Sequence, residues 1–99
     1  MVSLDSPLCI APEVLAQEVQ GDSVLLHLGT ESYFGLNPLG TLVWQRLAAG
    51  IPLRRIYDLL LREYAVGAEP LEGDLLDLVT RLSSAGLILV LPSGGADAG

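Results

Sequence analysis

A near-match to a phosphate-binding loop stands in the first half of the chain, in the segment GLNPLGT that ends at Thr41. A phosphate loop reads G-x-x-x-x-G-K-[ST]; its backbone N–H groups hold the phosphates and its lysine reaches the outer ones. Gly35 and Gly40 have this spacing, but Thr41 stands where the lysine should be, and Pro38 has no backbone N–H. We therefore interpret the segment as the end of a strand followed by the start of a helix.

Cys9 is the only cysteine and His27 the only histidine of the chain. A zinc site needs three or four ligands of these types or carboxylates, and a cysteine nucleophile needs a base and a third group that orients it. Nothing in the sequence brings such groups together. We therefore expect no metal site, no catalytic residue, no cofactor and no internal disulfide.

Acidic residues gather around the start of a predicted helix, at Glu69, Glu72, Asp74 and Asp77. Carboxylates in a first turn interact favourably with the helix dipole, and Asp77 with Arg81 forms an ordinary i, i+4 surface pair. The other interpretation is an acidic rim that attracts a basic peptide. The sequence leaves both open.

Composition narrows the class of partner. The 99 residues suffice for one domain, and a hydrophobic fraction of 51% indicates either a dense core or apolar surface that meets a partner. The net charge is −7 and there is no lysine, which disfavours nucleic acid as a partner.

The longest aliphatic run, residues 87–91, is far shorter than the ~20 residues of a membrane span. We expect a cytoplasmic protein with no membrane partner.

Period-2 patterns and turn signals predict three strands, over residues 14–19, 24–28 and 32–36, with turns at 20–23 and 29–32. Such short linkers imply an antiparallel meander. Residues 1–12 are expected to be an extended N-terminal segment, with one short extended piece around 8–10. Residues 13–91 would form the domain, and 92–99 a disordered tail.

Three helices are predicted after the strands. Asn37-Pro38 has the residue types of a helix start, and Gly50 ends that helix. Pro52 opens the second helix, and the third runs from about residue 71 to 85, with Gly86 as its left-handed end residue. The fold class is therefore α+β, a three-stranded antiparallel sheet followed by three helices.

The adjacent aromatic residues Tyr33 and Phe34 lie on the last predicted strand, so alternation sends one to the core and the other outward. If that strand is at the edge of the sheet, its free backbone groups are a template for an incoming strand. The opposite interpretation is an edge covered by the third helix.

The ordered pattern V-L-L-H-L-x-x-x-S-Y-F-G-L-N-x-L-G-x-x-V-W-x-x-L-x-x-G, over residues 24–50, resembles the PqqD-like proteins. The segments IYDLLLREY, LEGDLLDLVTRL and SAGLI continue the resemblance, which covers about residues 14–90. It implies a recognition element for ribosomally made and then modified peptides, a winged helix-turn-helix domain that binds the leader of the precursor peptide.

In that family the leader adds as a strand beside the third strand and lies in a groove against the third helix. Carried onto this chain, the resemblance implies a strand edge and a helix wall made of Ser32, Tyr33, Phe34, Gly35, Leu36, Asp74, Leu75, Leu78, Val79, Arg81 and Leu82.

One departure bears on the subtype. Proteins of the pyrroloquinoline quinone pathway look like P-E-G before the L-N, whereas this chain has G-T-E-S-Y-F-G. The pattern is more similar to the stand-alone recognition proteins of lasso-peptide pathways, which work with a separate leader peptidase and often basic leaders. An acidic rim at Glu72, Asp74 and Asp77 would suit such a leader.

The function expected from the sequence is non-catalytic binding of a leader peptide, which is then presented to a leader peptidase or another modifying enzyme. A winged-helix DNA-binding regulator is the alternative, since the architecture is the same, but its recognition helix should be basic. A homodimer that pairs edge strands is a further alternative.

Overall fold

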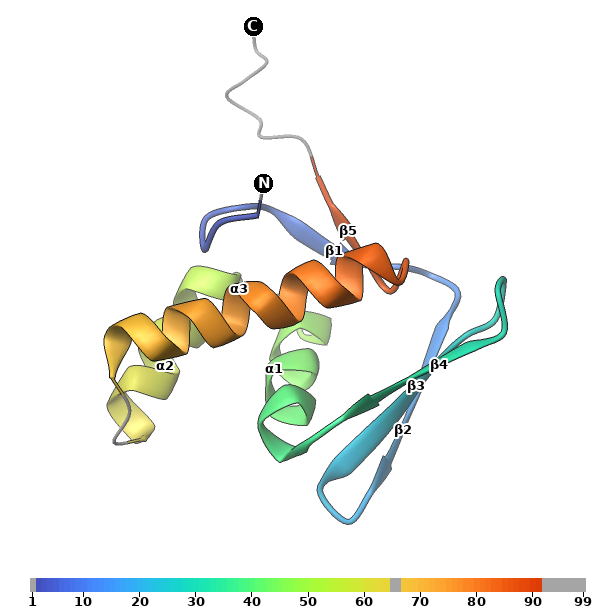
Figure 1. The fold of residues 1–99 in the computed structure, drawn as a ribbon, viewed down its shortest axis with the longest axis horizontal. Coiled ribbons are helices and arrows are strands. Elements are labelled where there is room, and N and C mark those ends of the chain that lie inside the picture. Colours follow the sequence, from blue (N-terminus) through green and yellow to red (C-terminus); the bar gives the residue numbers. More distant parts are fainter. Residues whose placement is uncertain (1, 65–66, 92–99) are drawn as a thin grey trace, which may run out of the picture.

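The computed structural model describes residues 2–64 and 67–91, so the tail predicted over 92–99 lies outside the described residues. The described chain forms two small sheets and three helices, whose arrangement can be followed in Figure 1. Their bounds are β1 Leu8–Ile10, β2 Val14–Val19, β3 Asp22–His27, β4 Ser32–Leu36, α1 Pro38–Ala48, α2 Leu53–Glu63, α3 Ala68–Ser84 and β5 Ile88–Val90.

The larger sheet has the antiparallel order β2-β3-β4, which confirms the predicted meander. Its first turn is centred one residue earlier than the middle of the predicted turn over 20–23, because Gln20 and Gly21 are the central residues, with φ of 53° and 91°. A two-residue hairpin turn of this kind needs positive φ at both central positions, and glycine meets that need most easily at the second. Asp22 therefore begins β3.

The smaller sheet pairs β1 with β5, antiparallel, from Leu8 opposite Val90 to Ile10 opposite Ile88. The extended piece expected around residues 8–10 is present as β1. The strand β5 was missed, because three apolar residues after a helix carry no strand signal of their own. This pair joins the N-terminal segment to the end of the described chain (Figure 1).

The helix ends follow the predicted local chemistry. The Asn37 side chain caps α1 by accepting a hydrogen bond from the Gly40 backbone N–H at 2.8 Å. At the end of α3, Gly86 has φ +78° and the Leu87 N–H donates to the Leu82 carbonyl at 2.9 Å, which is the Schellman arrangement. The helix α3 begins at Ala68, earlier than predicted, because a proline such as Pro70 fits within a first turn.

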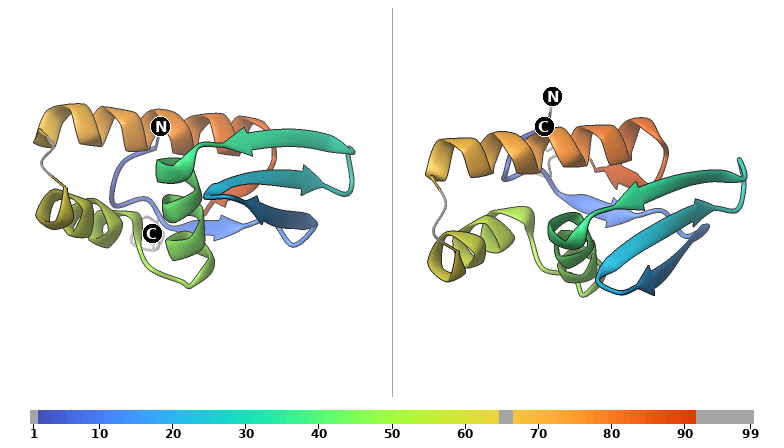
Figure 2. Two further views of the ribbon diagram at one scale, coloured as in Figure 1. Left: turned by 90° about the horizontal axis from the view of Figure 1, so that it is seen from below. Right: turned by 60° about the horizontal axis from the view of Figure 1, so that its bottom comes forward.

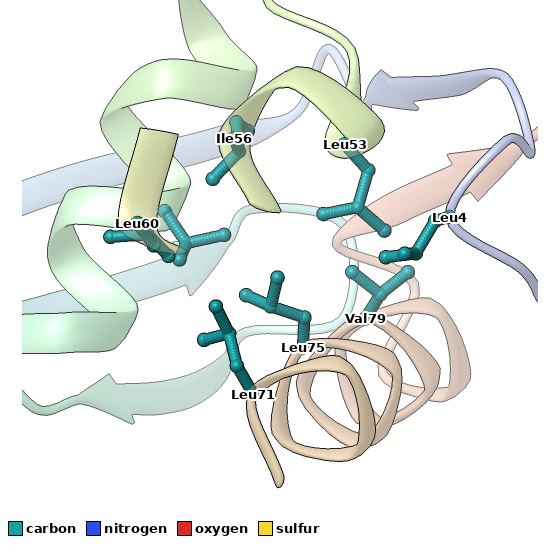
Figure 3. Packing of buried hydrophobic residues seen from close by; sticks show 8 residues of the cluster. Leu4, Leu53, Ile56, Leu60, Leu71, Leu75 and Val79 are labelled. Atoms are coloured by element: carbon teal, nitrogen blue, oxygen red, sulfur yellow. The ribbon is translucent and has the colours of Figure 1, made fainter. Parts of the chain in front are cut away.

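The core consists of two adjoining clusters. In the first, Leu53, Ile56 and Leu60 of α2 face Leu71, Leu75 and Val79 of α3, and Leu4 closes one end (Figure 3). The second cluster lies between the inner face of the larger sheet, α1 and the end of α3, and contains Leu25, Leu36, Trp44, Leu82, Leu87 and Ile88. Because Leu4 is only 3% exposed, the N-terminal segment contributes to the core of the domain.

Candidate functional site

A groove lies between β4, the start of α1 and the middle of α3, with a volume of about 360 Å³. Figure 2 shows α3 running alongside the β4 side of the larger sheet. The residues that line the groove come from all three elements: Gly35, Leu36, Asn37, Leu39, Gly40, Val43, Asp74, Leu75, Asp77, Leu78 and Arg81. The groove is therefore assembled by tertiary packing, with β4 as one wall and α3 as the other.

The strand β4 is last in the order β2-β3-β4, and among the described residues no strand pairs with its outer edge. Its side chains alternate as expected. Phe34 and Leu36 point inward and pack in the second core cluster, while Tyr33 points outward and is 75% exposed. Gly35 shares the outward face with Tyr33.

The register decides which backbone groups of β4 face the open edge. In an antiparallel pair, hydrogen-bonded and non-hydrogen-bonded residue pairs alternate, and a two-residue hairpin closes on a hydrogen-bonded pair. Val19 and Asp22 are that pair in the first hairpin, so Asp22, Val24 and every second residue of β3 direct their backbone groups to β2. The residues between them direct theirs to β4.

A hydrogen bond in the turn between β3 and β4 agrees with this assignment. The His27 carbonyl accepts a hydrogen bond from the Glu31 N–H at 2.7 Å, so it faces the β4 side. Its partner Ser32, like Phe34 and Leu36, therefore directs its backbone groups to β3. By alternation, Tyr33 and Gly35 have their N–H and C=O groups on the open edge. Those two residues can accept an added strand.

The floor of the groove is apolar and its rim is acidic. Leu36, Val43 and Leu75 are buried and Leu78 is half-buried, whereas Asp74 and Asp77 are exposed. A site of this kind favours a side chain that has an apolar stem and a cationic end.

Arg81 joins the two walls at the surface. Its guanidinium lies 5.9 Å from the centroid of the Phe34 ring, and its Nε lies 3.4 Å from Asp77 Oδ2. Both partners of the ion pair are well exposed, so the pair adds little to stability. Asp74 is then the rim carboxylate of the groove that forms no salt bridge with a basic side chain of the described residues.

Two glycines shape the groove in opposite ways. A Cβ at Gly35 would meet no atom within 4 Å, so the space beside this backbone is free. A Cβ at Gly40 would lie 3.2 Å from Leu36 Cδ2 and 3.3 Å from Asn37 Oδ1. Gly40 therefore serves close packing at the start of α1, and Gly35 leaves room for a neighbour from outside the chain.

The structure brings most of the predicted site residues to one place. Gly35, Leu36, Asp74, Leu75, Leu78 and Arg81 all line the groove, and Tyr33 lies on the adjoining edge. Val79 and Leu82 are fully buried in the two core clusters and do not line it, because they face α2 and the sheet. Ser32 is exposed at the start of β4, and Glu72 lies on α3 outside the groove.

Sequence reasoning missed the contribution of α1. Asn37, Leu39, Gly40 and Val43 line the groove, although the sequence assigned them only to the start and the packing face of a helix. The sequence signal that could have indicated them is Leu39, a large apolar residue directly after the N-terminal proline of α1. In the structure Leu39 is 40% exposed. A large apolar residue at that place faces outward or into a cleft.

The two residues considered for nucleophilic or metal chemistry have ordinary roles. His27 Nδ1 accepts hydrogen bonds from the N–H groups of Gly29 and Thr30 at 3.1 and 3.2 Å, so the ring holds the β3–β4 turn. Cys9 is a free, exposed cysteine on β1. Within residues 2–64 and 67–91, no three His, Cys, Asp or Glu side chains gather as metal ligands would.

No helix in the described part of the chain has both the length and the apolar character to cross a membrane.

Comparisons with known proteins agree with the geometry. The chain is 32% identical to TbiB1 in a structure titled as its complex with the TbiA(beta) leader peptide, with a TM-score of 0.79 over 85% of this chain and 98% of that one. It is 30% identical to a lasso peptide synthetase B1 complexed with the leader peptide, with a TM-score of 0.76 over 88% of this chain and 100% of that one. A comparison with curated proteins finds no match.

The family described as coenzyme PQQ synthesis protein D (PqqD) matches residues 22–88, about two thirds of the chain. This stretch runs from the start of β3 through the groove to β5. The family match, together with the agreement in sequence and fold with the two structures, confirms the predicted resemblance. The chain belongs to the PqqD family.

Proposed function

We propose that this protein binds the leader region of a ribosomally synthesised precursor peptide as an additional strand on β4, and that it does so without catalysis. The observation that carries the proposal is the open edge of β4 beside a groove walled by α3. Two similar structures, at 32% and 30% identity, are titled as complexes with a leader peptide.

The register suggests how such a strand would pair. Its backbone would bond to the N–H and C=O groups of Tyr33 and Gly35, because these two residues face the open edge. The leader residues paired with them would point to the outer face of the sheet. The residues opposite Phe34 and Leu36 would point inward, so the side chain beside Leu36 would enter the groove.

The lining of the groove suggests the chemistry of that inward side chain. An apolar floor at Leu36, Leu75 and Leu78 suits an aliphatic or aromatic residue, and the carboxylates of Asp74 and Asp77 suit a basic residue at the rim. We therefore propose a leader with an apolar residue that enters the groove and a basic residue that reaches its rim, as expected for a precursor of the lasso-peptide class.

The proposed role is presentation. A leader held on β4 keeps the attached core peptide near the enzyme that binds this domain, which raises the effective concentration of the substrate. Ordering an unstructured leader offsets part of the contact free energy. We expect a dissociation constant between nanomolar and micromolar, about −12 to −8 kcal/mol. A leader peptidase is the proposed enzyme partner.

DNA binding has less support. A winged-helix reader needs basic side chains along the helix that enters the major groove. The exposed residues of α3 include Glu69, Glu72, Asp74 and Asp77, with Arg81 as its one basic residue. Such a helix would repel the phosphate backbone.

The test is a titration of the purified protein with a fluorescent synthetic leader of the precursor peptide that it serves, followed by anisotropy. Gly35→Pro should reduce affinity at least tenfold, because proline lacks the backbone N–H that Gly35 presents at the open edge. Leu78→Asp should do the same by placing a charge on the groove floor.

Gly73→Ala is the matched control, since Gly73 is also open on its outer side but does not line the groove. Circular dichroism checks that each variant is folded. The proposal is wrong if folded Gly35→Pro and Leu78→Asp proteins bind the leader as tightly as the unaltered protein.

A further inference from the structure

The outer face of the larger sheet, which points away from the helices, carries exposed and half-buried apolar side chains. Leu15, Leu26 and Tyr33 lie side by side across the three strands, and Gln17, Val24 and Gly35 form the next row. Leu15 is 57% exposed and Val24 is 43% exposed. A shallow hollow lies over these rows, lined by Leu15, Ala16, Gln17, Val24, Leu26 and Tyr33.

Acidic residues stand at both ends of this face and basic residues are absent from it. Asp22 begins β3 at one end, and Glu13 and Glu31 flank the sheet at the other. The six residues of β3 separate these ends by about 20 Å. All five arginines lie on the helices, at Arg46, Arg54, Arg55, Arg62 and Arg81. A protein that covers this face should therefore have an apolar centre with basic side chains on either side.

The size of the bare face limits what it can bind alone. Three strands spaced about 4.8 Å apart and about 20 Å long present roughly 300 Å². A specific interface usually buries about 800 Å² on each partner. The three-stranded face is therefore too small for tight binding unless it is enlarged.

A strand added at β4 would enlarge the same face. Leader residues paired with Tyr33 and Gly35 would point outward and continue the two rows by one position. Gly35 has no side chain, so the second row has a notch between Val24 and the added strand, where a partner side chain can enter.

We infer that the outer face of β2-β3-β4, together with the outward side chains of the bound leader, is the docking surface for the enzyme that processes the precursor. The inference rests on the proposed leader binding for its fourth strand. The enzyme would recognise the domain and the leader at once, through an apolar patch flanked by basic residues. Binding of enzyme and leader would then be mutually reinforcing, because coupling between two binding events is reciprocal.

A second copy of this chain fits the face less well. Each copy carries a net charge of −7 and brings its own acidic ends to the interface. Like charges in an interface oppose association, whereas a partner with basic flanks gains from them.

The test uses the double variant Leu15→Thr/Val24→Thr, which removes the apolar patch and keeps strand-forming side chains at exposed positions. The matched control is Leu89→Thr/Val90→Thr on β5, where the same residue types are 46% and 39% exposed. The probe is the purified peptidase that cleaves the same precursor, and its binding is measured by biolayer interferometry with and without saturating leader.

For the unaltered protein we expect leader to tighten peptidase binding at least fivefold. Leu15→Thr/Val24→Thr should weaken peptidase binding at least tenfold in the presence of leader and leave the leader affinity within twofold. The β5 control should match the unaltered protein in both measurements. A charge test compares Asp22→Lys, which should weaken peptidase binding, with Glu63→Lys on α2, which changes net charge equally and should not.

Unchanged peptidase binding by Leu15→Thr/Val24→Thr, with normal leader binding, overturns the inference and leaves the proposed function intact. A dimer in multi-angle light scattering that the same variant converts to a monomer also overturns it, since a second copy would then be the occupant. If the leader fails to bind but the variant still weakens peptidase binding, both the proposed leader binding and the four-stranded docking surface are overturned, because the peptidase then docks on β2-β3-β4 alone.

Discussion

The hydroxyl oxygens of Ser23 on β3 and Thr41 on α1 lie 2.6 Å apart in the buried junction between the sheet and the first helix. Both residues are 4% exposed, so each hydroxyl depends on the other for a hydrogen bond. This contact fixes the start of α1 against the sheet, directly below the end of β4 that borders the groove.

Replacing Thr41 with Val should destabilise the protein by about 1–3 kcal/mol, because it leaves the buried Ser23 hydroxyl without its partner. Ser23→Ala/Thr41→Val should lose less than the sum of the two single variants, since it removes both polar groups. Urea unfolding followed by the fluorescence of Trp44, the only tryptophan, measures this. Additive single effects would show that the two hydroxyls do not interact.

Gly73, within α3, and Gly86, directly after the end of that helix, should respond oppositely to alanine. Gly73 lies within the helix and a Cβ there meets nothing within 4 Å, so Gly73→Ala should stabilise the protein by about 0.5–1 kcal/mol. Gly86 has φ +78°, so Gly86→Ala should destabilise it by about 1 kcal/mol. Thermal unfolding of both variants is the measurement, and equal shifts in the same direction would contradict the assigned helix end.

Asp74→Asn should weaken binding of a basic leader by up to about fivefold, the range of an exposed ion pair. It should also reduce the dependence of the dissociation constant on salt, because fewer charges are left to be screened. Glu72→Gln is the control on the same helix, since Glu72 does not line the groove. Anisotropy titrations at two salt concentrations give both quantities. Equal losses for the two variants would indicate a general charge effect and no specific rim.

The ion pair between Asp5 and Arg54 should make stability depend on pH at the acid end. Arg54 Nε and Nη2 donate to the two Asp5 oxygens at 3.0 and 2.8 Å, and these hydrogen bonds lower the pKa of Asp5. Because the pKa is lower in the folded state, the stabilisation is present above the unfolded value of about 3.9. It is lost as the pH falls through the folded value.

Asp5→Asn is the variant that isolates this contribution. Its difference in melting temperature from the unaltered protein should be small, since both side chains of the pair are exposed. The difference should shrink further below pH 4. A difference that stays constant from pH 7 to pH 3 would show that Asp5 acts through something other than its charge.

Sequence patterns that span only a few residues were enough to predict much of the fold. The bounds of β2 and β4, the cap at Asn37 and the helix ends at Gly50 and Gly86 depend on the side chain or the φ preference of one or two residues. Short-range chemistry of this kind can be recognised without knowing what lies elsewhere in the chain. The prediction that one of Tyr33 and Phe34 faces the core and the other faces outward followed from the same kind of rule.

Other features depend on contacts between distant parts of the chain, and only the tertiary structure decided them. The sequence did not indicate that Leu8–Ile10 pairs with Ile88–Val90, or that Leu4 enters the core, because nothing in a short apolar segment specifies its partner. It also did not separate Leu78, which lines the groove, from Val79, which is buried one residue later. A helix repeats every 3.6 residues, so the division between groove and core on α3 depends on where α1 and α2 pack against it.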